Sequence, residues 1–219
     1  TVSVNGEPAK KPNQMVGEAD ALSINDPASA YVSRAALKLL AGLDAGGISA
    51  SGKICLDVGS STGGFTQVLL ERGAAKVYAV DVGHDQLHQS LRDDPRVVSL
   101  EGQNARDLDG EIIPDGIDLL VSDVSFVSLT KVLAAPLALC APDAEAIILF
   151  KPQFEVGRDF VGKGGIVSDA EASERAMAEV VAFVEGAGFA LRRKVVSPIA
   201  GGDGNVETVL VFGRSSLLP

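Results

Sequence analysis

Apolar residues are spaced in two ways along this chain, and each spacing predicts a kind of element. From position 29 an apolar stripe recurs with the period of a helix, while Arg34 and Lys38 lie one turn apart on another face. Shorter runs are almost continuously apolar, as in strands buried on both faces. These runs lie at 53–57, 76–81, 97–100, 117–122 and 146–150. Strands that alternate with helical segments predict a doubly wound parallel sheet.

The C-terminal part of the chain has a different order. A helical pattern over 170–187 is followed by two β-rich stretches, 189–197 and 207–212, with only a glycine-rich loop between them. A connection that short between neighbouring strands requires an antiparallel hairpin. The predicted fold is therefore α/β, a Rossmann-like sheet of seven strands, mostly parallel with an antiparallel last strand. An open parallel sheet closed in this way is the arrangement of class I methyltransferases.

Residues 1–27 differ in their residue pattern from the rest of the chain. Val2-Ser3-Val4-Asn5-Gly6 predicts a strand that runs into a tight turn, and three prolines interrupt the remainder of the segment. Twenty-seven residues cannot bury a core of their own. The segment is either a linker or the end of a small domain, and the alternation in Val2–Gly6 favours the second. We therefore divide the chain into 1–27 and a main domain over 28–219.

Composition narrows the class of protein. The 219 residues carry a net charge of -10, which argues against a protein that holds nucleic acid by bulk electrostatics alone, so any nucleic-acid site must be a local basic patch. Two cysteines, Cys55 and Cys140, make no disulfide framework, and a reducing, cytoplasmic setting is expected. The most apolar region, 117–141, is interrupted by three charged residues, so we expect no membrane crossing.

A glycine-rich turn follows the first buried strand and opens a helix. It runs from Asp57 to Thr66, and it has neither the Gly-Lys-Ser/Thr ending of a phosphate-binding loop nor the glycine spacing of a dinucleotide site. An acidic residue that closes the strand, followed by glycines, resembles the motif that binds S-adenosyl-L-methionine. In that resemblance Asp57 lies near the methionine amino group, and Gly59 lets the backbone approach the cofactor. The alternative is a merely tight strand-to-helix turn.

Acidic and amide side chains follow the next two strands. Asp81 closes the second strand about 20 residues after the turn, where a carboxylate can accept hydrogen bonds from ribose hydroxyls, although NAD would satisfy it too. The segment 103–107 carries polar groups to the expected position of an adenine edge, and a capped loop is nearly as good an interpretation. The predicted cofactor-binding residues are Asp57, Gly59, Ser60, Ser61, Gly63, Gly64, Phe65, Asp81, Val82, Asn104, Ala105, Asp107 and Asp123.

Four charged residues form the predicted catalytic set: Lys38, Asp123, Lys151 and Glu207. Asp123 ends the fourth strand without the Asn/Asp-Pro-Pro-Tyr/Phe pattern typical of enzymes that methylate exocyclic amines, so an amine acceptor is disfavoured. Lys151 follows the near-fully apolar run 146–150 and enters the same crevice. Taken singly, Lys38 fits a solvated helix face and Glu207 a cross-strand pair. Together, in this order at these junctions, they favour a functional site.

The chemistry that suits this set is transfer of a methyl group to a ribose hydroxyl. A 2′-hydroxyl is a poor nucleophile, so positioning and electrostatics must do most of the work. Lys151 would stabilise the developing alkoxide or accept its proton, with Asp123 holding the lysine. Lys38 and Glu207 would complete a hydrogen-bonded ring around the hydroxyl. Such a site needs no metal, and His84 and His88, four residues apart, have no evident third ligand.

The sequence resembles a known family. The order of the four charged residues matches the FtsJ-like ribose 2′-O-methyltransferases, and four segments within 29–212 look like its TlyA (hemolysin-type) branch. The resemblance implies methylation of cytidine 2′-hydroxyls in ribosomal RNA, with ribosomal RNA or ribosomal subunits as partners. It also implies a small N-terminal RNA-binding module, and residues 1–25 look like its last third. The four segments are Tyr31–Lys38, Asp57–Thr66, Phe150–Glu155 and Gly204–Glu207.

Basic residues remain where an RNA could lie. We predict contacts from Arg34, Arg158 and Lys163, the last two in a glycine-rich stretch, 157–165, that is either a lid or simply flexible. Two other functions stay open from the sequence. One is a nucleotide-binding oxidoreductase, which the glycine spacing disfavours. The other is a hemolysin-like, membrane-acting protein, as the name of the branch suggests.

Overall fold

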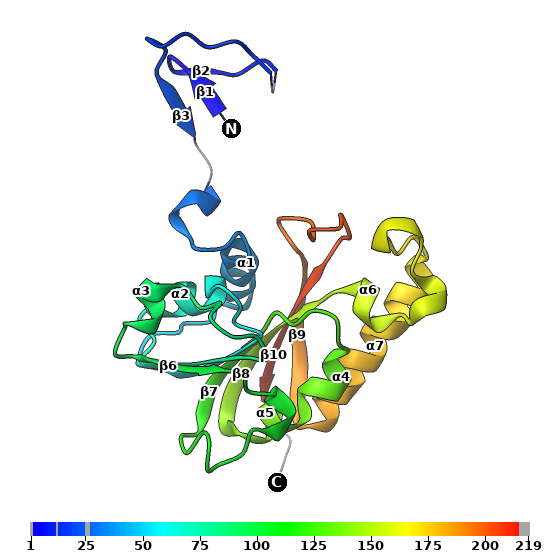
Figure 1. The fold of residues 1–219 in the computed structure, drawn as a ribbon. Coiled ribbons are helices and arrows are strands. Elements are labelled where there is room, and N and C mark those ends of the chain that lie inside the picture. The colour runs from blue at the N-terminus through cyan, green and yellow to red at the C-terminus, as the bar shows by residue number, and fades with distance from the viewer. Residues whose placement is uncertain (1, 12, 25–26, 215–219) are drawn as a thin grey trace.

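The computed structural model describes residues 2–11, 13–24 and 27–214, and most of them are organised around one seven-stranded sheet (Figure 1). The short apolar runs of the sequence form its strands. Hydrogen-bonded neighbours follow one another across the sheet in this order: β6 (Val97–Glu101), β5 (Lys76–Asp81), β4 (Ile54–Val58), β7 (Ile117–Ser122), β8 (Cys140–Phe150), β10 (Thr208–Arg214) and β9 (Phe189–Val196).

Strand direction agrees with the prediction. Strands β4 to β8 pair in parallel, and β10 is antiparallel to both of its neighbours, β8 and β9. The mostly parallel sheet with an antiparallel last strand, the arrangement of class I methyltransferases, is thus confirmed. Strand β8 begins at Cys140, six residues before the expected run at 146–150. Its first part contains Pro142 and the exposed Asp143, so it carries no continuous apolar signal.

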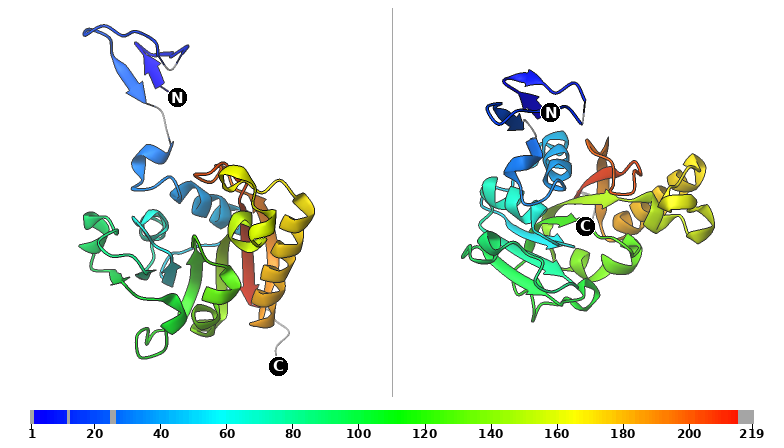
Figure 2. Two further views of the ribbon diagram at one scale, coloured as in Figure 1. Left: turned by 45° about the vertical axis from the view of Figure 1, so that its right-hand side comes forward. Right: turned by 45° about the horizontal axis from the view of Figure 1, so that its top comes forward.

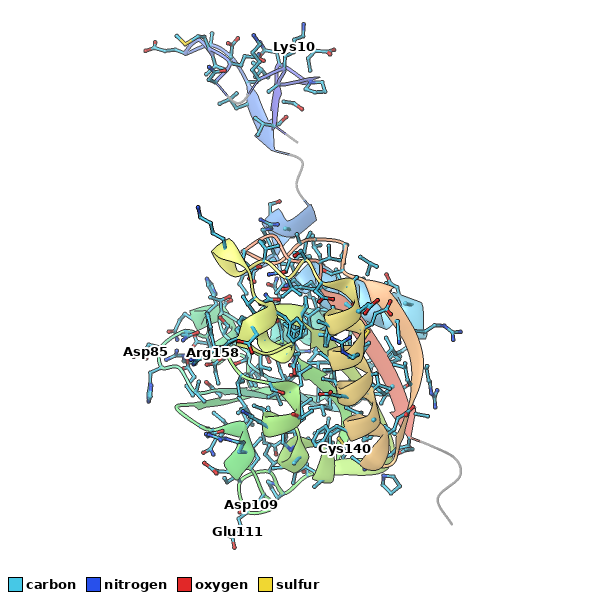
Figure 3. The ribbon with its side chains drawn as sticks, turned by 90° about the vertical axis from the view of Figure 1, so that its right-hand side faces the viewer. Lys10, Asp85, Asp109, Glu111, Cys140 and Arg158 are labelled. Carbon is cyan, nitrogen blue, oxygen red and sulfur yellow. The ribbon has the colours of Figure 1, made fainter. Side chains whose placement is uncertain are left out.

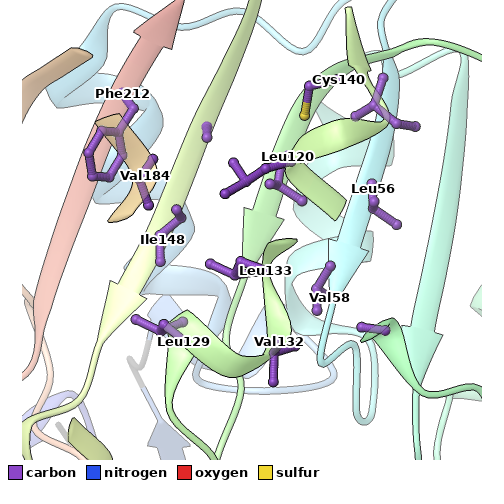
Figure 4. Close-up of a cluster of buried hydrophobic side chains, with 14 of the residues drawn as sticks. Leu56, Val58, Leu120, Leu129, Val132, Leu133, Cys140, Ile148, Val184 and Phe212 are labelled. Carbon is purple, nitrogen blue, oxygen red and sulfur yellow. The ribbon is translucent and has the colours of Figure 1, made fainter. Parts of the chain in front are cut away.

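Helices cover both faces of the sheet and create two apolar cores. On one face, α1 (Ala36–Gly46) and α2 (Gly64–Glu71) pack with strand residues such as Leu119. On the other, α4 (Leu129–Val132), α5 (Ala134–Ala138) and α7 (Ala170–Gly186) pack on Leu120 and Ile148, as Figure 4 shows for part of this cluster. Adjacent residues 119 and 120 enter opposite cores because side chains alternate along a strand.

A close approach of α1 to the sheet determines where Lys38 lies. A Cβ added to Gly42, one turn after Lys38, would come within 2.7 Å of the Ile147 side chain on β8 and 2.9 Å of the Val209 side chain on β10. Since no real Cβ tolerates such distances, glycine is what allows α1 to lie directly on these two strands. The helix ends at Gly46, and the C-cap residue Gly47 has a left-handed φ of 61°.

Short elements connect the layers at the ends of the strands. A four-residue helix, α3 (Gln89–Arg92), precedes β6, and α6 (Pro152–Glu155) follows Lys151. The remaining turns are the 3-10 helices η1 (Pro27–Ala30), η2 (Ala105–Asp107), η3 (Arg158–Phe160) and η4 (Lys163–Gly165).

A small three-stranded sheet is formed by residues near the N-terminus. It is antiparallel, in the order β2 (Glu7–Pro8), β1 (Val2–Val4), β3 (Leu22–Ile24), and both views of Figure 2 show it beyond α1. The expected turn is present, with positive φ at Asn5 and Gly6. Residues 1, 12, 25–26 and 215–219 lie outside the described part of the chain. The proposed boundary at 27/28, and the assignment of 1–27 to a module, stay predictions.

Candidate active site

The four predicted catalytic residues come from four different elements and meet at the carboxyl ends of the parallel strands. Lys38 lies on α1, Asp123 follows β7, Lys151 follows β8 and Glu207 immediately precedes β10. Lys151 Nζ lies 2.5 Å from Asp123 Oδ1, and Lys38 Nζ lies 2.5 Å from Glu207 Oε2. Lys38 Nζ is also 4.0 Å from Asp123 Oδ2. The four side chains therefore form one continuous chain of ion pairs.

Burial makes this chain of charges unusual. Lys38 and Lys151 are each 7% exposed, and Glu207 is 2% exposed. A buried charge is expensive unless it is paired, and here two lysines face two carboxylates. The alternative interpretation of Lys38 as a solvated helix residue is wrong. Replacing a buried ion pair with apolar side chains is often neutral or stabilising, so stability alone gives no reason for four such charges in one place.

Lys151 has a further polar partner and an aromatic neighbour. Its Nζ donates a hydrogen bond to Ser125 Oγ at 2.8 Å and lies 6.0 Å from the centre of the Phe154 ring. An ammonium group has three N–H donors, and Asp123 and Ser125 account for two partners among the described residues. Lys151 also lines the smaller cavity, so its ammonium group can reach a molecule bound there.

The acidic residue of the glycine-rich turn is fully buried and only half satisfied. Asp57 Oδ2 accepts a hydrogen bond from Thr66 Oγ1 at 2.7 Å, whereas Oδ1 has no hydrogen-bond partner among the described residues. Burial raises the pKa of Asp57 to about 7, against the lowering effect of Thr66. An unsatisfied buried carboxylate oxygen fits a cationic group, such as an amino group, brought in by a ligand.

Gly59 has a structural role that the sequence did not reveal. Its φ is 85°, and a Cβ added there would lie 2.9 Å from the backbone oxygen of Asp123. Glycine thus lets the turn after β4 touch the loop after β7 that carries Asp123. The expected role of Gly59 toward a cofactor stays a prediction beside this one.

Two cavities open beside these residues and share part of their walls. The larger has a volume of about 620 Å³ and extends along the ends of β4, β5 and β7, and the smaller has about 150 Å³ and reaches Lys151. Asp123 and Ser125 line both. Of the predicted cofactor residues, the larger cavity is lined by Gly59, Ser61, Asp81, Val82, Asn104, Ala105 and Asp123, and the smaller also by Ser60, Gly64 and Phe65.

Other predicted residues line neither cavity or make hydrogen bonds within the turns. Asp57, Gly63 and Asp107 line neither cavity. The Asp81 carboxylate accepts hydrogen bonds from the backbone N–H groups of Ser61 at 2.8 Å and Gly83 at 2.7 Å. Asn104 caps η2 by accepting from the Arg106 N–H at 3.1 Å. The capped-loop interpretation therefore holds for Asn104, which lines the cavity as well.

Sequence reasoning missed several residues of the site. Ser125 and Phe126 follow Asp123 in the loop after β7 and line the larger cavity together with Gln86. Phe126 is 91% exposed, has a left-handed φ of 66°, and its ring centre lies 5.2 Å from that of Phe154. Ser125 and Phe126 could have been found from their position in the sequence. They lie just beyond the predicted strand 117–122, and residues just beyond a parallel strand face the crevice at its carboxyl end.

The predicted RNA-contacting residues are exposed. Arg34 lies two residues before the start of α1. Arg158, labelled in Figure 3, and Lys163 lie on η3 and η4. The loop that carries the last two is fastened to the turn before Glu207. Asn205, 2% exposed, accepts a hydrogen bond from the Val167 N–H at 2.9 Å and donates one to the Gly165 carbonyl at 2.8 Å.

Metal-ligating clusters and membrane-spanning helices are both absent from the described part of the chain. Among residues 2–11, 13–24 and 27–214, no group of three or more His, Cys, Asp or Glu side chains could hold a metal ion. None of the helices described is both long and apolar enough to cross a membrane.

Comparison with known proteins gives consistent matches over most of the chain. The family model described as FtsJ-like methyltransferase matches residues 31–214. The 16S/23S rRNA (cytidine-2′-O)-methyltransferase TlyA of Mycobacterium tuberculosis is 47% identical over 210 residues, which are 95% of this chain and 78% of that protein. Hemolysin A of Brachyspira hyodysenteriae is 46% identical over 185 residues, 83% of this chain and 76% of that protein.

A solved structure matches the small N-terminal sheet as well as the main domain. It is a protein from Streptococcus thermophilus described as a hemolysin, with a TM-score of 0.83 and 37% sequence identity. The match covers 98% of this chain and 79% of that one. Proteins named as hemolysins and proteins named as ribosomal RNA methyltransferases are thus similar to this chain over largely the same residues.

Proposed function

The chain belongs to the FtsJ-like methyltransferase family, and from that premise we propose that it transfers a methyl group from S-adenosylmethionine to the 2′-hydroxyl of a cytidine ribose in ribosomal RNA. One observation carries the proposal: the buried chain of ion pairs from Lys151 through Asp123 and Lys38 to Glu207. The family is one of methyltransferases, which removes the oxidoreductase alternative.

The residues of the glycine-rich turn fit the cofactor. Asp57 Oδ1 is a buried acceptor without a partner among the described residues, and its charge suits the amino group of the methionine part. Asp57 lines neither cavity, so the glycine-rich turn would have to open for the two groups to meet. Asp81 lines the cavity of about 620 Å³ and matches the ribose hydroxyls, because each carboxylate oxygen can accept a second hydrogen bond beside the one from the backbone. The bound cofactor supplies an activated methyl group on a sulfonium. Asp123, at the junction of the two cavities, lies between this region and Lys151.

The chain of ion pairs provides what a ribose hydroxyl needs. Negative charge develops on the oxygen as the hydroxyl proton leaves, and this makes the oxygen able to attack the methyl carbon. The methyl–sulfur bond would break as the carbon–oxygen bond forms, which would leave the cofactor as a neutral thioether. Lys151 Nζ can donate a hydrogen bond to that oxygen or, when neutral, accept the proton, while Asp123 and Ser125 hold it in place. Lys38 Nζ faces the other oxygen of Asp123 at 4.0 Å, and Glu207 in turn holds Lys38. No step requires a metal.

The acceptor RNA would approach over the exposed cations beside the site. Arg34, Arg158 and Lys163 are exposed and suit contacts to phosphates. Phe126 offers an exposed aromatic ring at the cavity, on which a base can stack. The net charge of -10 leaves recognition to such local groups, and we assign the segment 1–27 to an RNA-binding module that would add to them.

Substitution of Lys151 tests the proposal. Lys151→Ala should abolish methyl transfer to ribosomal RNA while leaving the dissociation constant for S-adenosylmethionine nearly unchanged, because Lys151 does not line the larger cavity. Removing one partner of a buried pair costs about 3–5 kcal/mol, so the melting temperature is measured alongside. Lys151→Arg keeps the positive charge but moves the N–H donor, so it should also lose methyl transfer. This variant tests the proposal if Lys151→Ala does not fold.

A lysine elsewhere serves as the matched control. Lys53 also lies 2.5 Å from a carboxylate, that of Glu145, but it precedes β4 and so lies at the opposite end of the strands from the site. The Lys53→Ala variant should retain methyl transfer. Equal activity of Lys151→Ala and wild-type protein would refute the mechanism.

A further inference from the structure

One partly buried carboxylate next to the site has no part in the mechanism above. Glu155 is the last residue of α6, four positions after Lys151. Its Oε1 accepts a hydrogen bond from the Leu129 N–H at 2.9 Å, and its Oε2 accepts one from Ser128 Oγ at 2.8 Å. Burial raises the pKa of Glu155, although both hydrogen bonds lower it. The Glu155 carboxylate is thus partly removed from water, and both of its hydrogen bonds go to the loop after β7.

The two loops joined by Glu155 are the ones that carry the central ion pair. The loop after β7 runs from Asp123 to the start of α4 at Leu129, and the segment after β8 runs from Lys151 to Glu155. At one end they are joined by the contacts of Lys151 with Asp123 and Ser125, and at the other by the two hydrogen bonds of Glu155. The rings of Phe126 and Phe154 meet between these ends.

Glu155 supplies what the loop after β7 lacks locally. Ser128 is the N-terminal cap residue of α4 but makes no capping hydrogen bond with its own side chain, and α4 is only four residues long. The Glu155 carboxylate takes the place of such a cap by accepting from the first N–H of the helix. Phe126 has a left-handed φ of 66°, which a bulky residue keeps only where the surroundings fix the backbone.

We propose that Glu155 is a positioning residue for methyl transfer, whose carboxylate fixes the loop after β7 against the Lys151 segment and so keeps Asp123 and Lys151 in register. The inference rests on the proposed function for its effect on rate, although the loop fixation it describes can be observed without any RNA. Glu155 touches neither cavity wall nor any of the four charged residues of the ion-pair chain in the contacts described. It acts through the loop.

Three variants separate this role from a general loss of stability. Glu155→Ala leaves the Leu129 N–H without its acceptor. Glu155→Gln keeps an acceptor for that N–H and can donate to Ser128 Oγ, so it should rescue the geometry. Asp109→Ala is the matched control, because the Asp109 Oδ1 also accepts two backbone N–H groups, of Glu111 and Ile112, both at 3.0 Å. Asp109 lies before β7, away from the loop that follows it, and is labelled in Figure 3.

The first readout is the single-turnover rate of methyl transfer with saturating ribosomal RNA and S-adenosylmethionine. A misplacement of about 1 Å in a reacting group can cost about 100-fold, so Glu155→Ala should lower this rate by roughly 10- to 100-fold. Its dissociation constant for S-adenosylmethionine should stay at the wild-type value, and Glu155→Gln and Asp109→Ala should keep the wild-type rate. A wild-type rate in Glu155→Ala, or a fall in rate matched by an equal loss of cofactor affinity, would overturn the inference.

The second readout does not depend on catalysis. The chain contains no tryptophan, so Phe126→Trp introduces a single fluorescent reporter into the loop after β7. Adding Glu155→Ala to this variant should lower the fluorescence anisotropy of the reporter, whereas Glu155→Gln or Asp109→Ala should not. Unchanged anisotropy would overturn the inference. If the wild-type protein methylates no ribose, the proposed function fails, and this measurement still decides whether Glu155 fixes the loop after β7.

Discussion

Replacing Asp57 with asparagine should increase the stability of the cofactor-free protein and decrease its affinity for the cofactor. Asp57 is fully buried, and only its Oδ2 has a partner among the described residues, Thr66 Oγ1 at 2.7 Å. Burial raises its pKa from the ordinary 3.8 to about 7. At about 1.36 kcal/mol per pKa unit, this difference corresponds to at most roughly 4 kcal/mol.

Proton binding determines the sign of the effect on stability. Between pH 3.8 and about 7 the folded protein keeps a proton on Asp57 that the unfolded chain has lost, so the contribution of Asp57 to stability falls as pH rises through this window. Above pH 7 the carboxylate is ionised in both states, and its full burial cost is present. The asparagine amide of the variant would carry no charge at any pH. The free energy of unfolding of Asp57→Asn should therefore match that of the wild type near pH 4 and exceed it by up to about 4 kcal/mol at pH 8.

Urea unfolding at pH 4 and pH 8 measures the first effect, and calorimetric titration with S-adenosylmethionine measures the second. The cofactor amino group would lose its anionic partner in Asp57→Asn, which should weaken binding by about 10-fold or more. Asp118→Asn is the control, because Asp118 accepts the Ile54 N–H at 2.8 Å and lies at the start of β7, far along the strand from Asp123. A variant that binds the cofactor as tightly as the wild type, or that is less stable at pH 8, would refute the reasoning.

Two other variants, the second a double substitution, test the turn after β4 and the exposed cations. Gly59→Ala should destabilise the protein by about 1–3 kcal/mol and lower the rate of methyl transfer, because a Cβ would lie 2.9 Å from the Asp123 carbonyl oxygen at a φ of 85°. Urea unfolding curves and methyl-transfer rates measure the two effects, and an unchanged unfolding midpoint would contradict the prediction. Replacing both Arg158 and Lys163 with alanine should weaken ribosomal RNA binding and reduce the slope of log affinity against log salt by about 2 if each contacts one phosphate. Filter binding at several salt concentrations measures that slope, and an unchanged slope would remove both residues from the RNA contact.

The sequence was sufficient for those parts of the site that depend on strand ends. Asp123 and Lys151 directly follow apolar runs, and parallel neighbouring strands bring their carboxyl ends together, so their proximity could be predicted. The place of Lys38 could not be derived in the same way. It depends on how closely α1 lies on the sheet, which Gly42 permits through contacts with two distant strands.

Contacts between loops could not be predicted from the periodicity of apolar residues. The hydrogen bond from the Leu129 N–H to Glu155 spans 26 positions and joins a backbone group to a side chain, so no repeating pattern records it. The early start of β8 was hidden by exposed residues, among them Asp143. The contact of Gly59 with the Asp123 loop could be found only in the structure. A glycine in a turn indicates that a Cβ would clash, but the sequence does not say with which atom.

The most direct test of the central claim identifies the methylated atom. The protein is incubated with unmodified ribosomal RNA and S-adenosylmethionine carrying a labelled methyl group, the RNA is digested to nucleosides, and the labelled product is identified by chromatography and mass spectrometry. We predict label in 2′-O-methylcytidine with wild-type protein and with Lys53→Ala, and none with Lys151→Ala. Label in a base-methylated nucleoside, or undiminished label with Lys151→Ala, would contradict it.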